Sequence, residues 1–84
     1  MNGKKFKEIR NQLELSQEQL AAVLGYSGKQ AICNIETGRK NPSPLLATLM
    51  QVFIELPKKR SEELREILLS ISERRKKVKI GGKR

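Results

Sequence analysis

Apolar residues recur along this chain at spacings of three and four positions, the period of an amphipathic helix. Phe6, Ile9 and Leu13 show this spacing first, with Arg10 on the same face, and they predict a helix over residues 3–13. No segment alternates between apolar and polar residues as a half-buried strand does. The pattern therefore predicts an all-α fold.

Capping residues divide the rest of the chain into further helices. Ser16, with Gln19 three positions later, forms a capping box, and Gly25 ends the helix that follows. Ser43 before Pro44 starts another helix, because proline is favoured at the first helical position. The last helix is expected to start after the cap Ser61. The predicted helices after the first are 17–24, 29–36, 44–56 and 62–75.

The predicted helix 44–56 is apolar round most of its circumference, so we expect it to be buried on more than one side. The helix over 62–75 offers a stripe that can cover one side, and a second copy of the chain can cover another. The stripe comprises Leu64, Ile67, Leu68 and Ile71. We take Met50, Ile54 and Leu69 as candidate residues of a dimer or partner surface, with an ordinary exposed leucine as the alternative for Leu69.

The 84 residues suffice for one small domain, and the formal charge of +9 is spread unevenly. Residues 1–72 hold 11 basic and 8 acidic side chains, a net of +3, whereas residues 73–84 hold 7 basic and 1 acidic, a net of +6. We expect a domain over 1–72, whose last helix reaches about residue 75, and a basic tail over 73–84 that is disordered around Gly81 and Gly82. Such a tail attracts nucleic acid, an anionic membrane or an acidic protein.

The residue types that most enzymes and metal sites need are scarce in this sequence. The chain has no His, no Asp and one Cys, Cys33, which excludes an internal disulfide and a cysteine-based zinc site. No phosphate-binding loop signature occurs either. We therefore expect no enzyme, no metal, no cofactor and no small-molecule ligand. Without a signal-peptide-like or membrane-spanning apolar run, we expect a cytoplasmic protein that does not bind membranes.

The predicted helix 29–36 has one apolar face and one polar face of low charge. Ala31, Ile32 and Ile35 share the first face. The opposite face holds Lys29, Gln30, Cys33, Asn34 and Thr37. Amide side chains can make paired hydrogen bonds to adenine, and lysine suits guanine, so this face is suited to reading base edges in DNA.

The segment from Phe6 to Phe53 resembles the Cro and phage-repressor class of helix-turn-helix domains, over a little more than half of the chain. The resemblance implies a compact five-helix, lambda-repressor-like domain whose third helix enters the DNA major groove, usually in a dimer. The matching features are Leu15-Ser16-Gln17-x-x-Leu20-Ala21, Leu24-Gly25, Ile32 with Ile35, Glu36-x-Gly38-Arg39, and Pro42.

The resemblance also implies roles for single residues. It pairs Arg10 with Glu36 as a structural ion pair and places Gln17 at a phosphate, with a solvated capping residue as the alternative reading of Gln17. Gln30 and Asn34 fall on base-reading positions, with Lys29 beside them. Cys33 lies between them, either against a thymine methyl group or as a bystander. Thr37, Arg39 and Lys40 are expected to contact phosphates.

One departure from the family lies in the turn. Gly25 to Glu36 is eleven positions, one more than in many members, and a similar spacing is seen in some antitoxin regulators. We expect a sequence-specific DNA-binding regulator, a homodimeric repressor of a palindromic operator that binds double-stranded DNA. The alternative is an antitoxin or adaptor that mainly binds a protein partner such as a toxin. An RNA-binding factor is less favoured, because the chain has few aromatic residues to stack on bases.

Overall fold

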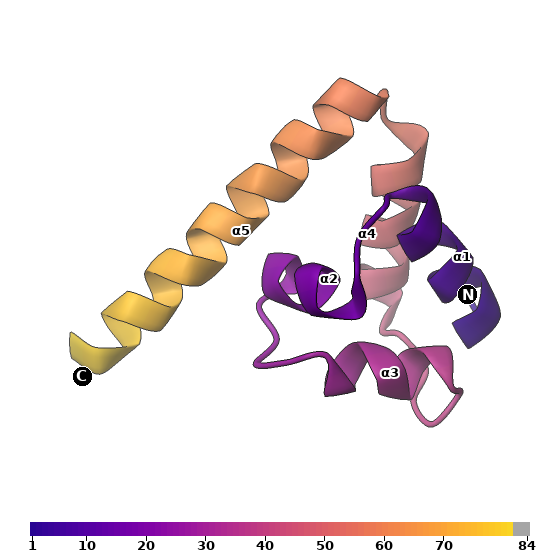
Figure 1. Cartoon of the computed structure of the whole chain (residues 1–84), viewed down its shortest axis with the longest axis horizontal. Helices are drawn as coiled ribbons and strands as arrows, with labels where there is room; N and C mark the ends of the chain where they lie inside the picture. Colours follow the sequence, from indigo (N-terminus) through magenta and orange to yellow (C-terminus); the bar gives the residue numbers. More distant parts are fainter. Residues whose placement is uncertain (82–84) are drawn as a thin grey trace.

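The protein is built from helices. The computed structural model describes the backbone of residues 1–81 and the side chains of residues 1–75. This part of the chain contains five helices and no strand, as the sequence predicts (Figure 1). They are α1 (Gly3–Gln12), α2 (Gln17–Leu24), α3 (Gln30–Glu36), α4 (Pro44–Glu55) and α5 (Lys58–Gly81).

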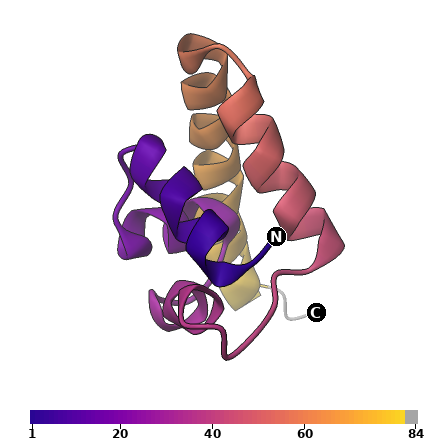
Figure 2. The ribbon, with the colours of Figure 1, turned by 90° about the vertical axis from the view of Figure 1, so that its right-hand side faces the viewer.

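A single apolar core lies among the first four helices. Its fully buried side chains include Phe6, Ile9, Leu20, Ile32, Met50 and Phe53, which come from all four of these helices. α4 packs against α1 and α5, and α2 packs against α3 and α5, so α5 crosses the outside of the bundle. Figure 2 shows the first turns of α5 beside the end of α4 at the same end of the molecule. Within the described residues, no helix is long and apolar enough to cross a membrane.

The caps of α2 and α4 are those that the sequence predicts. The Ser16 Oγ accepts from the Gln19 N–H at 3.0 Å, and the Gln19 Oε1 accepts from the Ser16 N–H at 2.8 Å. Gly25 ends α2 in the left-handed conformation, with φ of 84°. The Ser43 Oγ accepts from the Leu46 N–H at 3.1 Å at the start of α4. Local side-chain chemistry therefore sets where these two helices begin.

The boundaries of α5 differ from the prediction. The helix begins at Lys58, and Ser61 lies inside its first turn, where its N–H donates to the Pro57 carbonyl at 2.9 Å. The cap assigned to Ser61 is therefore wrong, because Pro57 already stops α4 and permits a helix directly after it. The helix continues beyond residue 75 to Gly81, since no glycine or proline intervenes. Of the residues predicted to be disordered, Gly81 is the last residue of α5, and Gly82 lies outside the described part of the chain.

The buried face of α5 also differs from the predicted apolar stripe. Leu64, Leu68 and Leu69 pack on the core, whereas Ile67 and Ile71 are 56% and 39% exposed. The buried face instead includes small or charged residues, Ser61, Arg65 and Ser72. Met50 is completely buried in the core, which corrects its assignment to a contact surface. Ile54 and Leu69 are half-buried against the same core.

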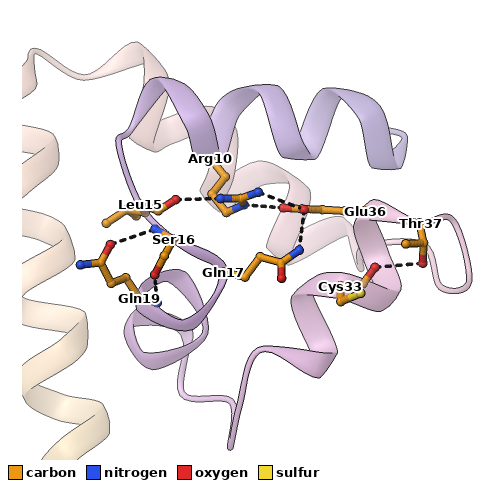
Figure 3. A network of polar contacts seen from close by, with 8 residues as sticks. All are labelled: Arg10, Leu15, Ser16, Gln17, Gln19, Cys33, Glu36 and Thr37. Atoms are coloured by element: carbon orange, nitrogen blue, oxygen red, sulfur yellow. Dashed lines mark hydrogen bonds and ion pairs between the residues drawn. The ribbon is translucent and has the colours of Figure 1, made fainter.

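Arg10 and Glu36, the residues that the family resemblance pairs, form a buried ion pair (Figure 3). The Arg10 Nε donates to the Glu36 Oε2 at 2.5 Å, and Arg10 Nη2 donates to Oε1 at 3.2 Å. Arg10 Nη1 donates to the Leu15 carbonyl at 2.8 Å, and the Gln17 amide donates to the Glu36 Oε1 at 2.9 Å. The side chains of Arg10 and Glu36 are only 10% and 4% exposed. This network ties the end of α3 to α1 and α2.

The Glu36 carboxylate is charged because its partners compensate for its burial. Burial alone raises the pKa of a carboxyl group, but the hydrogen bonds from Arg10 and Gln17 and the charges of Arg10 and Lys7 outweigh it. The pKa of Glu36 in the folded protein therefore lies below its ordinary value. A carboxyl group with a lowered pKa stabilises the fold at neutral pH, and this stabilisation is lost as the pH falls through the lowered value.

Gly3 marks a close approach that the sequence does not predict. A Cβ atom on Gly3 would lie 2.7 Å from the Glu36 carbonyl oxygen and still closer to that of Ile35. Both oxygens belong to the last turn of α3, so the start of α1 packs backbone to backbone against it. Only glycine allows this approach at position 3.

We predict that Gly3→Ala destabilises the fold, by about 1–3 kcal/mol, because the methyl group forces α1 away from α3. Helix propensity alone predicts the opposite sign, since alanine is the better helix former. The matched control is Gly28→Ala, where the added Cβ meets no atom within 4 Å and the backbone is not left-handed. Urea unfolding followed by circular dichroism measures both variants. A Gly3→Ala protein as stable as the wild type would contradict the close packing.

We predict that Glu36→Gln lowers the free energy of unfolding at pH 7 by about 3 kcal/mol, because it leaves the Arg10 guanidinium buried without its counter-charge. The difference from the wild type should shrink as the pH falls below the ordinary carboxyl value of 4.5 and through the lowered pKa of Glu36, because the folded wild type then loses the charge on this carboxyl group. Denaturant unfolding between about pH 3 and pH 7 measures it. The control Glu66→Gln changes an exposed carboxylate and should have little effect. A difference independent of pH would refute the assignment.

Candidate nucleic-acid interface

The five residues from Gly25 to Lys29 connect α2 to α3. The Gly25 N–H donates to the Ala22 carbonyl at 3.2 Å, and the Tyr26 N–H donates to the Ala21 carbonyl at 2.9 Å. These two bonds close the end of α2 around the left-handed Gly25. Tyr26 then packs partly on the core, and the chain enters α3 at Gln30.

α3 is held to the bundle by one face. Ile32 is completely buried and Ile35 is 6% exposed, as the predicted apolar face requires, while Ala31 is half-buried. The opposite face is therefore turned away from the core. Lys29 and Gln30 are exposed there, and Cys33 and Asn34 are half-buried.

The amide side chains on this outer face are joined to each other. The Gln30 Nε2 donates to the Asn34 Oδ1 at 3.0 Å, one helical turn apart. This bond holds both amides in a defined orientation. It leaves the Gln30 carbonyl oxygen and the Asn34 amide nitrogen unused by any hydrogen bond among the described residues. The pair therefore presents both an acceptor and a donor to a ligand.

Cationic residues flank the two ends of α3. After the helix, Gly38 is left-handed with φ of 86°, and the Lys40 N–H donates to the Asn34 carbonyl at 3.1 Å. This turn leaves Arg39 and Lys40 exposed beside the helix end. Within residues 25–42 the single carboxylate is Glu36, whose charge Arg10 compensates. The outer side of α3 therefore favours an anionic partner.

Two of the predicted phosphate-binding residues, Gln17 and Thr37, form hydrogen bonds within the protein. The Thr37 Oγ1 donates to the Cys33 carbonyl at 2.9 Å, so this exposed hydroxyl closes the last turn of α3. Gln17 is half-buried, and its amide nitrogen donates to Glu36. One N–H of that amide remains for another acceptor. The sequence does not predict the contact between Gln17 and Glu36.

The structure brings most of the predicted site residues together. α3 and its two ends carry Lys29, Gln30, Cys33, Asn34, Thr37, Arg39 and Lys40, and Gln17 lies at the start of α2. Arg65 was missed as a structural residue, although its Nη1 donates to the Leu13 carbonyl at 3.4 Å. Its position among Leu64 and Leu68 is the same signal that marks Arg10: a charged residue on an apolar helix face.

A family model described as helix-turn-helix matches residues 6–55. The match covers more than half of the chain, from α1 to the end of α4, and includes the turn and the whole of α3. Comparison with curated proteins and with solved structures gave no significant match. The chain therefore belongs to the Cro and phage-repressor class of the helix-turn-helix family, and it is a DNA-binding transcriptional regulator.

Proposed function

We propose that this protein is a cytoplasmic transcriptional repressor that binds a palindromic operator as a homodimer and reads its bases with α3. The main support for this proposal is the outer face of α3. It presents the joined amides of Gln30 and Asn34, with cations at both ends, on a helix whose other face is fixed in the core. An uncharged reading face between cationic flanks separates base recognition from phosphate binding.

The proposed base contacts follow from the chemistry of each side chain. Gln30 and Asn34 suit adenine, whose N6 and N7 offer one donor and one acceptor. Lys29, at the start of α3, suits guanine, whose O6 and N7 are both acceptors. The Cys33 thiol lies one residue before Asn34 on the same outer face and suits a thymine methyl group.

The proposed phosphate contacts surround this face. Arg39 and Lys40 are exposed directly after α3, where the DNA backbone passes a helix that lies in the major groove. Gln17 contributes a neutral donor through its remaining amide N–H, whereas Thr37 would donate only after its hydroxyl leaves the Cys33 carbonyl. These contacts fix the register of α3 on the duplex without carrying sequence information.

The homodimer is proposed because α3 alone is too short to specify a site. Its 7 residues span about 10 Å, which is the rise of roughly three base pairs. Two copies related by a two-fold axis would read half-sites about 34 Å apart. Ile67 and Ile71 on α5 are exposed large apolar residues one turn apart, and they are the proposed contact between copies.

An antitoxin or adaptor is the second candidate function, and the same two isoleucines favour it. An apolar strip on the outside of α5 can bind another protein as well as a second copy. In that case the DNA contact of α3 would serve autoregulation, and the regulator would form a complex with its partner.

We predict that the double variant Gln30→Ala with Asn34→Ala loses its preference for a selected operator over a scrambled duplex, by about tenfold or more for each residue. Its affinity for scrambled DNA should stay near that of the wild type, because the phosphate contacts remain. Fluorescence anisotropy with the two duplexes measures this ratio.

The matched control for this double variant is Asn11→Ala with Gln12→Ala, which removes two exposed amides from α1. The control should keep the operator preference. If the α3 variant keeps the same preference as the control, α3 does not read the bases through its amides.

We predict that Ile67→Asp converts a dimer into a monomer, because a carboxylate on the proposed contact surface is costly to bury. Sedimentation equilibrium measures the mass, and titration of the operator counts the copies bound. The control Leu45→Asp places the same charge on α4, at a leucine that is 78% exposed. One wild-type copy per operator would contradict the homodimer. A dimeric Ile67→Asp protein would contradict the α5 contact.

A further inference from the structure

The charges along α5 are segregated. Its first half holds Glu62, Glu63 and Glu66 among its basic residues, whereas the stretch from Arg74 to Lys79 holds five basic residues and no acidic one. The sequence therefore concentrates positive charge toward the C-terminal end of α5, and such a concentration favours an anionic partner.

The described cations of this stretch are free to meet such a partner. Arg74 and Arg75 are both exposed. Among the residues whose side chains the structure describes, neither takes part in an ion pair, since the pair formed there joins Arg10 to Glu36. Glu73 is the single carboxylate within four positions of Arg74 and Arg75. The local charge of this end of α5 is therefore not compensated from within the helix.

The basic end of α5 lies on the same side of the molecule as α3. Both views show the last turns of α5 and α3 at one end of the structure, with the start of α5 at the other (Figures 1 and 2). A depression between α5 and the turn before α3 is lined by Ser72 and Arg75 from α5 and by Gly25 and Ser27 from the turn. A Cβ atom on Gly25 would lie 3.5 Å from the Ser72 Oγ. The end of α5 is thus placed beside the segment that leads into α3.

We propose that Arg74 and Arg75, in the C-terminal half of α5, bind the phosphate backbone of the same duplex that α3 enters, beside the bases that α3 reads. This inference rests on the proposed function, because it places the DNA on the α3 side. The contact adds affinity without sequence information. It lengthens the occupied DNA beyond the base pairs that α3 touches.

The opposite end of α5 supplies a matched control. Lys58 and Lys59 are exposed cations on the first turn of the same helix. At a rise of 1.5 Å per residue, they lie about 24 Å from Arg74 and Arg75 along the axis. This is about three Debye lengths at physiological salt, so charges at one end cannot replace charges at the other.

The test compares two double variants. One carries Arg74→Gln and Arg75→Gln, and the other carries Lys58→Gln and Lys59→Gln. Both remove two positive charges, and glutamine keeps a similar helix propensity. The affinity for a selected operator is measured between about 50 and 200 mM salt. Over this range the wild type should lose about tenfold more affinity than the Arg74 and Arg75 variant, since each phosphate contact changes the log–log slope by about 0.9. The Lys58 and Lys59 variant should keep the wild-type slope.

A second arm uses an operator whose phosphates between the two half-sites are replaced by neutral methylphosphonates, because a contact between copies at Ile67 and Ile71 would place Arg74 and Arg75 near the two-fold axis. On this duplex the wild type should show the shallower slope that the Arg74 and Arg75 variant shows on the unmodified operator. Equal slopes for the two double variants on the unmodified operator would overturn the proposal, and so would a wild-type slope that the neutral phosphates do not change. The operator preference of the Gln30 and Asn34 variant separately tests the proposed function. A failure of base reading by α3 can therefore be distinguished from a failure of the phosphate contact by α5.

Discussion

The buried network of Arg10, Glu36 and Gln17 is the interaction on which the rest of the structure depends. A helix of 7 residues such as α3 is not stable by itself, so its position must be imposed by contacts with other helices. Ile32 and Ile35 hold one face in the core, and Glu36 ties the end of the helix to α1 and α2. Gly3 completes this arrangement, because the missing side chain lets α1 reach the carbonyl groups of the same turn. Specific contact with DNA requires such a fixed helix.

The same network removes an electrostatic conflict. A carboxylate at the end of a DNA-reading helix would repel phosphates, but Glu36 is 4% exposed and bound by the Arg10 guanidinium. The neighbouring residues of low charge, Gln30 and Asn34, are then free to act as hydrogen-bonding groups, while Arg39 and Lys40 supply the positive charge nearby. Structural stabilisation and the proposed DNA recognition would thus use different residues of one short segment.

The sequence predicted those features of the fold that depend on neighbouring residues. The capping box at Ser16 and Gln19 and the left-handed Gly25 are local, and the structure confirms them. The start of α5 was predicted wrongly because Ser61 has the residue type of a cap but lies within a helix that begins after Pro57. The burial of Met50 and the close approach at Gly3 depend on which helices meet in space, and periodicity within one helix does not contain that information. On α3, the two faces were predictable because apolar spacing separates them, whereas the bond between Gln17 and Glu36 joins two helices.

α5 connects two parts of the proposed mechanism. It packs on α2 directly before the reading helix, and it carries Ile67 and Ile71 on its exposed side and the basic residues from Arg74 onward at its end. Because α5 is one continuous helix, a contact between copies at Ile67 and Ile71 would also fix the position of the basic end of α5 in each copy. Dimer formation and flanking phosphate contacts would then be coupled through one rigid element. Loss of the dimer contact should in that case weaken the salt-dependent part of DNA binding as well as the recognition of the second half-site, because both need α5 in a fixed position.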